Sequence, residues 1–98
     1  MPKVIFTISY AIKPEERAHY LTLVGELKNR LATVGKNFSV FETKGKRNHF
    51  HEVYVFNSED EYDALDDNQD EQTQDLLSKL EACVDDGGMK YATGIETV

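Results

Sequence analysis

The chain has 98 residues, of which 40% are hydrophobic and 30% are charged, a composition typical of a soluble globular protein. No apolar run approaches the roughly 20 residues that a membrane helix needs, and the N-terminal residues show no signal-peptide pattern, so we expect neither membrane association nor secretion. The single cysteine, Cys83, cannot form an internal disulfide, which favours a cytoplasmic location.

The formal net charge of −7 is concentrated in residues 59–75, which hold nine of the 18 acidic residues and no Lys or Arg. Such a run is typical of a solvated helical face and its adjoining loop. A calcium site fits less well, because the glycine and glutamate spacing of an EF-hand is absent. The acidic excess also argues against nucleic-acid binding, because nucleic-acid phosphates repel it.

The first predicted strand covers Val4–Ile12, where larger apolar side chains occupy alternate positions. These side chains share one face of the strand: Val4, Phe6, Ile8, Tyr10 and Ile12. The other face is small and mildly polar apart from Ile5. A strand with so little charge on either face is expected to be central and covered on both sides.

A helix is predicted from Pro14 to about Val34. Proline is well tolerated in the first turn of a helix, and Gly35 supplies a C-terminal stop. The residues that recur at three- and four-residue steps form one buried stripe: Tyr20, Val24, Leu27, Leu31 and Val34.

Residues 38–43 and 49–56 read as two strands of a hairpin, joined by a polar turn that contains Gly45. Ser58 then begins a second helical block, with Glu61 completing a capping box.

The second helical block is expected in two pieces, with residues 66–75 as a loop or an exposed helical turn between them. Tyr62 and Leu65 anchor the first piece. The second carries an apolar stripe in which Cys83 packs as a small hydrophobic side chain. A last, weaker strand is predicted over Met89–Val98.

The order strand, helix, strand, strand, helix, strand predicts an α+β fold of the ferredoxin-like split βαβ type (β-α-β-β-α-β). We expect residues 1–98 to form a single domain with a four-stranded antiparallel sheet and helices on one face. Two helical blocks cannot cover both apolar faces of the sheet. A second copy of the chain is the simplest cover for the other face, so the sequence predicts a homodimer.

Other protein classes with this order need residues that this chain lacks. Acylphosphatases need a glycine-rich, anion-binding loop after the first strand, but residues 11–17 contain no glycine. Metallochaperone domains need paired cysteines at the same place. Phe50, Tyr54 and Phe56 alternate as the base-stacking aromatics of RNA-recognition domains do, yet the glycines of that motif are missing.

Three stretches resemble the dimeric α/β-barrel proteins of the antibiotic-biosynthesis-monooxygenase type. They are residues 4–8 followed by 13–17, the stretch from His51 to Tyr62, and the closing strand near residues 89–98. The resemblance implies a barrel built from two sheets packed face to face across a two-fold axis. It also implies a pocket between the sheet and the helices of each subunit.

The resemblance implies one of two activities. The first is monooxygenation of an aromatic or quinol-like substrate without a cofactor, in which the protein binds and deprotonates the substrate and stabilises its charge. The second is haem degradation, which is disfavoured because the chain has no Trp and no His after His51. We therefore expect no cofactor and no metal. Whether the protein is an enzyme stays open, the alternative being a non-catalytic dimeric binding or interaction module.

Candidate catalytic residues are Glu52, His49 and His51. The two histidines share one face of their strand, about 6.5–7 Å apart, where they form an exposed strand end or, with His19, a metal site. Glu52 points to the opposite face among aromatic side chains, where a carboxyl group has a raised pKa unless it is paired. It is thus an acid–base candidate or half of an intersubunit ion pair.

Candidate substrate-binding residues are Tyr10, Tyr54 and His19. Tyr10 lies on the central strand, where its hydroxyl either donates a hydrogen bond into a pocket or packs in the core.

Overall fold

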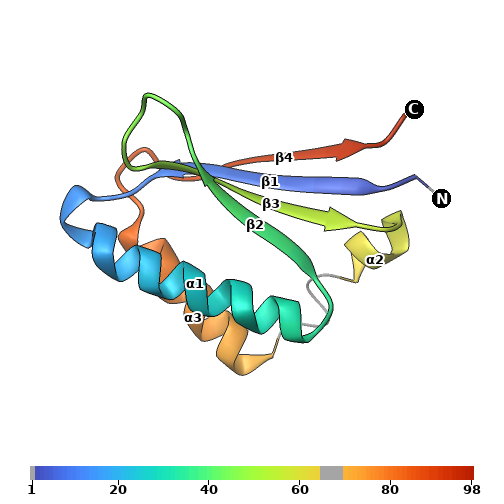
Figure 1. Ribbon diagram of the computed structural model, residues 1–98, viewed down its shortest axis with the longest axis horizontal. Coiled ribbons are helices and arrows are strands. Elements are labelled where there is room, and N and C mark those ends of the chain that lie inside the picture. Colours follow the sequence, from blue (N-terminus) through green and yellow to red (C-terminus); the bar gives the residue numbers. More distant parts are fainter. Residues whose placement is uncertain (1, 65–69) are drawn as a thin grey trace.

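The computed structural model describes residues 2–64 and 70–98, and Figure 1 shows their arrangement. In these described residues, four strands and three α-helices follow the order β1, α1, β2, β3, α2, α3, β4, with a 3₁₀ turn at Pro14–Glu16 before α1. Their bounds are β1 Val4–Ala11, α1 Arg17–Thr33, β2 Asn37–Glu42, β3 His49–Phe56, α2 Glu59–Asp63, α3 Glu71–Cys83 and β4 Lys90–Ile95. The predicted β-α-β-β-α-β order is confirmed.

The strands form one antiparallel sheet in the order β2-β3-β1-β4, so β1 is central as predicted. α1 and α3 lie side by side beneath one face of this sheet (Figure 1). α2 lies at the C-terminal end of β3. We call the face away from α1 and α3 the open face. The expected four-stranded sheet with helices on one face is therefore confirmed.

α1 packs on the sheet through a buried stripe with the predicted spacing: Tyr20, Leu23, Val24, Leu27 and Leu31. The prediction that Val34 continues the stripe is wrong. The helix ends at Thr33, and Val34 is 61% exposed. Gly35 follows with a φ of 77°, a left-handed conformation that glycine adopts without steric cost, so the chain leaves the helix there.

The second helical block begins at Ser58, whose Oγ accepts a hydrogen bond of 3.2 Å from the Glu61 amide. The reciprocal bond differs from the expected capping box, because the Glu61 carboxylate accepts from the amide of Asn57. Asp70 caps α3 by accepting from the Thr73 amide at 2.7 Å. Of residues 66–75, the structure describes 70–75: Asp70 caps α3, and residues 71–75 belong to that helix. The rest of this predicted segment, and Leu65, lie outside the described residues.

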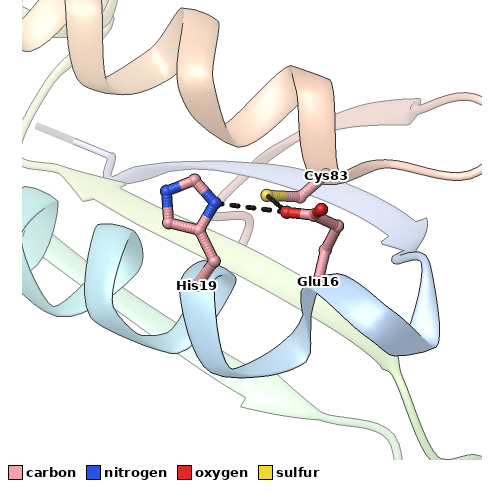
Figure 2. A group of neighbouring side chains, drawn as sticks. All are labelled: Glu16, His19 and Cys83. Atoms are coloured by element: carbon pink, nitrogen blue, oxygen red, sulfur yellow. Dashed lines mark hydrogen bonds and ion pairs between the residues drawn. The ribbon is translucent and has the colours of Figure 1, made fainter.

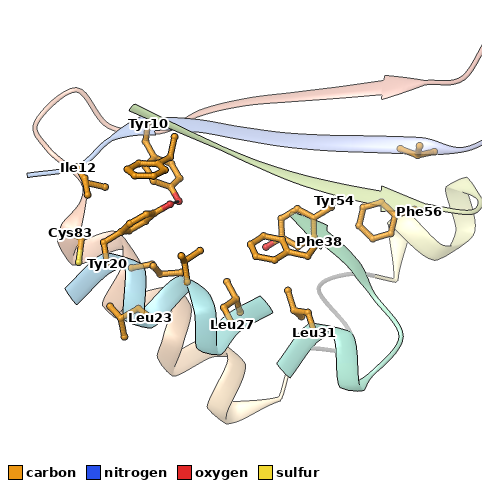
Figure 3. Packing of buried hydrophobic residues seen from close by; sticks show 14 residues of the cluster. Tyr10, Ile12, Tyr20, Leu23, Leu27, Leu31, Phe38, Tyr54, Phe56 and Cys83 are labelled. Atoms are coloured by element: carbon orange, nitrogen blue, oxygen red, sulfur yellow. Dashed lines mark hydrogen bonds between the residues drawn. The ribbon is translucent and has the colours of Figure 1, made fainter. Parts of the chain in front are cut away.

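The core between the sheet and the helices is rich in aromatic side chains (Figure 3). The Phe38 and Tyr54 rings lie 4.7 Å apart, and those of Tyr20 and Phe50 lie 4.6 Å apart. Cys83 is buried in the last turn of α3, as predicted.

The last strand is shorter than predicted, because its ladder with β1 ends where Ile95 pairs with Val4. Val98 is fully exposed. At the other end of β1, Ile12 forms only an isolated bridge to Val84. No helix in the described part of the chain has the length and apolar character needed to cross a membrane.

Candidate functional site

Glu52 lies between the sheet and α1, where it is only 2% exposed. The hydroxyl of Tyr10 donates a hydrogen bond to Glu52 Oε2, and the hydroxyls of Tyr10 and Tyr20 lie 2.7 Å apart. Because the Tyr10 proton points to the carboxylate, Tyr20 is the donor in the second bond. Figure 3 shows the two tyrosines reaching toward each other from β1 and α1. Glu52 Oε1 has no hydrogen-bond partner among the described residues.

Burial raises the pKa of Glu52 above its usual value. The hydroxyl groups of Tyr10 and Tyr54 oppose this rise in pKa, Tyr10 more strongly than Tyr54. Tyr54 makes no contact of normal hydrogen-bond geometry with Glu52 Oε1. Burial and the nearby Glu52 carboxylate together raise the pKa of both Tyr10 and Tyr54. A carboxyl group that keeps its proton to higher pH is the kind that serves as a general acid or base.

A pocket of about 380 Å³ lies at the end of the sheet where β1 ends and β3 begins. This volume falls within the range of roughly 300–1,000 Å³ that is usual for small-molecule sites. The lining comes from β1, β3, the β2–β3 turn and the segment that leads into β4. It consists of Ser9, Tyr10, Ala11, Thr43, Lys46, His49, Phe50, His51, Asp85, Gly87, Gly88 and Lys90. We call this the histidine pocket.

Two hydroxyl groups hold His51 in the histidine pocket. Its Nδ1 lies 2.8 Å from Ser9 Oγ, and its Nε2 lies 2.7 Å from Thr43 Oγ1. Ser9 is directly opposite His51 in the β1–β3 ladder, which fixes the first contact. A neutral imidazole donates through one ring nitrogen and accepts through the other, so one hydroxyl accepts a hydrogen bond from the ring and the other donates one to it. The two contacts fix the orientation of the His51 ring.

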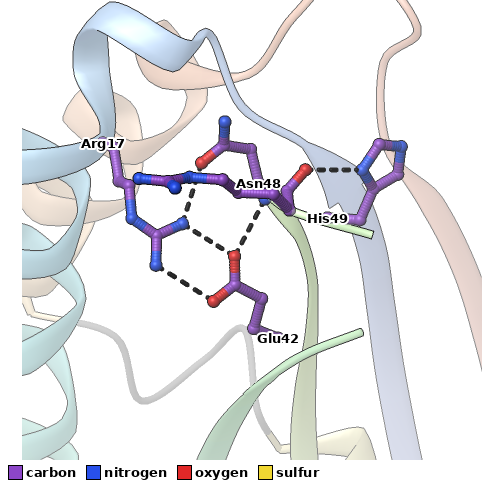
Figure 4. A network of polar contacts seen from close by, with 5 residues as sticks. Arg17, Glu42, Asn48 and His49 are labelled. Carbon is purple, nitrogen blue, oxygen red and sulfur yellow. Dashed lines mark hydrogen bonds and ion pairs between the residues drawn. The ribbon is translucent and has the colours of Figure 1, made fainter. Parts of the chain in front are cut away.

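His49 lies at the outer end of β3 and is exposed. Its Nδ1–H donates to the carbonyl oxygen of Arg47 at 3.1 Å (Figure 4). The same turn is fastened to α1 by Arg17, which makes a two-point ion pair with Glu42 and a 2.8 Å hydrogen bond to Asn48 Oδ1. These contacts hold the wall of the histidine pocket in place.

The histidine pocket carries an excess of positive charge. Lys46 and Lys90 line it on two sides, and Asp85 is its one acidic residue. A site of this charge favours an anionic ligand or one that becomes anionic, such as a phenolate or an enolate.

The structure divides the predicted site residues among three places. Tyr10, His49 and His51 line the histidine pocket. Glu52 and Tyr54 lie on the helix-facing side of β3, and the hydroxyl of Tyr10 connects that side to Glu52. His19 lies elsewhere, on α1, where its Nδ1 is 3.2 Å from Glu16 Oε2. It does not join the His49 and His51 pair, so the structure gives no support to a three-histidine metal site.

Sequence reasoning missed three kinds of group at the site: the Ser9 and Thr43 hydroxyls, the Lys46 and Lys90 ammonium groups, and the Tyr20 hydroxyl. Ser9 alone carried a usable signal, because it is a polar residue on the less apolar face of a central strand. The others depend on the ladder register and on how α1 is turned toward the sheet.

No protein-family model matches this chain, and no curated protein does. Solved structures match it over nearly its whole length. A conserved protein from Methanosarcina mazei Go1 is 13% identical with a TM-score of 0.84, and the match covers 99% of this chain and 95% of that one.

Two further matches carry names that concern function. An antibiotic biosynthesis monooxygenase is 19% identical with a TM-score of 0.72, covering 100% of this chain and 98% of that one. SnoaB from Streptomyces nogalater, named as a cofactor-independent oxygenase, is 15% identical with a TM-score of 0.69, covering 98% of this chain and 92% of that one. At these identities the likeness concerns the fold. The chain therefore has the ferredoxin-like fold of the antibiotic-biosynthesis-monooxygenase-like proteins, which confirms the resemblance.

Proposed function

We propose that this protein is a homodimeric α/β-barrel protein that binds a small aromatic or quinol-like molecule in the histidine pocket and oxidises it without a cofactor. The observation that carries the proposal is the half-buried His51, held between two hydroxyl groups in the lining of a pocket with two lysines. Cofactor-independent oxygenase activity in a protein of the same fold, SnoaB, supports the same class of reaction.

The proposed reaction begins with removal of a proton from a carbon of the bound substrate. The proton passes to His51, directly or through the hydroxyl of Ser9 or Thr43, and the ammonium groups of Lys46 and Lys90 stabilise the anion. The carbanion then reduces O₂, and the two combine to a peroxide anion, which takes the proton back from His51 to give a hydroperoxide. Loss of water removes the second hydrogen of the same carbon and leaves a carbonyl group, so O₂ supplies one atom to the product and one to water.

Glu52 takes a positioning role in this proposal. Its carboxyl group is buried behind Tyr10, and its hydrogen bond fixes the tyrosine that also lines the histidine pocket. We expect Glu52→Gln to change the pH profile of the reaction, because it removes a buried ionisable group next to the pocket wall.

Oxygen uptake with hydroxylated polycyclic aromatics tests the proposal. His51→Ala is expected to lower kcat by about 100-fold or more, the usual contribution of a positioned general base. Thr43→Val removes one hydroxyl contact to His51 and should also slow the reaction. Thr22→Val, an equal change on the exposed face of α1, serves as its matched control. The proposal fails if the wild-type protein never exceeds background uptake, or if His51→Ala keeps the full rate.

A non-catalytic dimeric interaction module is the second candidate. One observation favours it: aromatic and leucine side chains fill the space between the sheet and the helices around Glu52. In this case hydroxylated aromatics would neither bind nor react. The dimer would still form through the open face.

A further inference from the structure

We propose that Glu16, His19 and Cys83 form a zinc site. Among the described residues, these three offer a carboxylate oxygen, an imidazole nitrogen and a sulfur that all lie within 4.8 Å of one another. Figure 2 shows His19 on α1 and Cys83 at the end of α3 both in contact with the carboxylate of Glu16. The inference is independent of the histidine pocket and its proposed reaction.

The donor atoms are already close to the separations of a tetrahedral zinc centre. Zinc–ligand bonds of about 2.0–2.3 Å place neighbouring donor atoms about 3.3–3.8 Å apart in a tetrahedral centre. Glu16 Oε2 lies 3.2 Å from His19 Nδ1 and 3.8 Å from Cys83 Sγ. A ring nitrogen of His19 and Cys83 Sγ also lie within 4.8 Å of each other, so a rotation of the exposed His19 side chain would bring the three donor atoms around one ion.

The backbone holds the two halves of this site together. The Lys13 amide donates to the Cys83 carbonyl at 2.9 Å, and the Asp85 amide donates to the Ala11 carbonyl at 3.0 Å. The segment before α1 is therefore bonded to the end of α3. Glu16 and His19 are three residues apart in sequence and project to the same side. The site joins elements that are 67 positions apart along the chain.

The donor set suits zinc in particular. A mixture of thiolate, imidazole and carboxylate is typical of this borderline-soft ion, whereas Mg²⁺ and Ca²⁺ prefer oxygen ligands alone. Three protein ligands leave the fourth tetrahedral position for water. The side chains of His19 and Glu16 are 59% and 38% exposed, so this position faces solvent.

Binding requires that Cys83 lose its proton. Burial and the Glu16 carboxylate raise the pKa of the Cys83 thiol, while the nearby Lys13 lowers it. Without metal, two oxygens can accept from the thiol: Glu16 Oε2 at 3.8 Å and the carbonyl oxygen of Lys79 at 3.6 Å. Zinc binding displaces the thiol proton, so about one proton is released for each ion bound.

Calorimetric titration of the purified protein with Zn²⁺, in two buffers of different ionisation enthalpy, measures the affinity and the proton release. Absorption after titration with Co²⁺ reports a sulfur ligand through a thiolate-to-cobalt charge-transfer band. We expect one zinc ion per chain, release of about one proton, and this band in the wild-type protein.

Cys83→Ser should abolish the charge-transfer band. His19→Ala should weaken zinc binding at least tenfold, because removing even a residue that only hydrogen-bonds to a metal ligand lowers metal affinity by about that much. His19→Ala changes an exposed side chain, so its result does not depend on the tolerance of the core for a change at Cys83. His49→Ala is the matched control, since His49 is equally exposed but lies on the open face. Absence of zinc binding by the wild-type protein, or unchanged affinity in His19→Ala, would overturn the proposal.

Discussion

Glu52 is the only buried acidic or basic side chain in the described part of the chain, and its two carboxyl oxygens differ in their hydrogen bonding. Oε2 accepts from Tyr10, whereas Oε1 has no partner among the described residues. A buried polar atom without a hydrogen bond lowers stability, and the cost is larger when the group is charged. Ionisation of Glu52 is therefore expected to oppose folding.

The raised pKa of Glu52 predicts how stability changes with pH. The folded state holds the proton more tightly than the unfolded state, whose pKa is near the ordinary 4.5. The stabilising contribution of this group is fully present below that pH and is lost as the pH rises toward the raised, folded-state pKa. Glu52→Gln removes this dependence, so the variant should gain stability relative to wild type as the pH rises from 4.5 to neutral. Urea denaturation at several pH values measures this, with exposed Glu81→Gln as the control.

At the scale of elements, the β2–β3 hairpin and α1 are fastened together by the Arg17 and Glu42 ion pair (Figure 4). Arg17 Nη1 and Nη2 lie 2.7 and 3.0 Å from the two Glu42 carboxylate oxygens, and the Asn48 amide also donates to Glu42 at 2.9 Å. The two-point geometry is the strongest form of such a pair. The ion pair holds in place the turn that carries Thr43 and Lys46, which both line the histidine pocket.

This ion pair predicts acid sensitivity of the hairpin. The hydrogen bonds from Arg17 and Asn48 lower the pKa of Glu42 from 4.5 to about 2. A lowered folded-state pKa gives stability that is present above the unfolded value and is lost as the pH falls from about 4.5 to about 2. Thermal denaturation should show a larger fall in Tm over this range for wild type than for Glu42→Gln. Equal slopes for the two proteins would contradict the assignment.

α1 packs on the sheet, and its two faces differ sharply in burial. Leu27 is fully buried, whereas Leu21 is 44% exposed. Leu27→Ala should cost about 2–5 kcal/mol through lost burial and a residual cavity. Leu21→Ala serves as the control and should cost much less, since little of its side chain leaves water on folding. Denaturant titration measures both; similar losses would mean that α1 does not pack on the sheet through the Leu27 face.

At the scale of the whole molecule, the open face has two unlike halves. The ladder places Ile5 opposite Val55, and Thr7 opposite Val53, so one half is largely apolar. The other half holds the histidine pocket, where Ser9 pairs with His51 and with Lys90. We expect the apolar half to form the contact between two copies of the chain while the polar half binds the ligand.

Light scattering at micromolar concentration tests the predicted dimer. Wild type should have a mass about twice the 11.2 kDa of one chain. Ile5 is 45% exposed, and Ile5→Lys places a charge in the contact, which should shift the mass toward that of one chain. Lys36→Glu, in the turn before β2, is the control. It changes the charge more than Ile5→Lys does and should leave the mass unchanged. A wild-type mass of one chain would refute the dimer.

The sequence predicts the fold well because hydrophobic periodicity decides both the order of elements and the faces of the strands. The alternation within β3 correctly separates Glu52 from His49 and His51. The hydrogen-bond partners of His51 could not be predicted, because the strand register brings Ser9 to it from 42 positions away in the sequence. The place of His19 depends on the rotation of α1 against the sheet. Neither register nor rotation can be read from local pattern.

An NMR titration with a hydroxylated polycyclic aromatic tests whether the ligand binds in the histidine pocket. Binding in the histidine pocket predicts saturable shifts of the backbone amide signals of Ser9, Thr43, His49, His51 and Lys90. Signals from the exposed face of α1, such as Thr22, should stay in place. Shifts confined to the helix-facing residues around Tyr54, or no saturable shifts at all, would contradict binding in the histidine pocket.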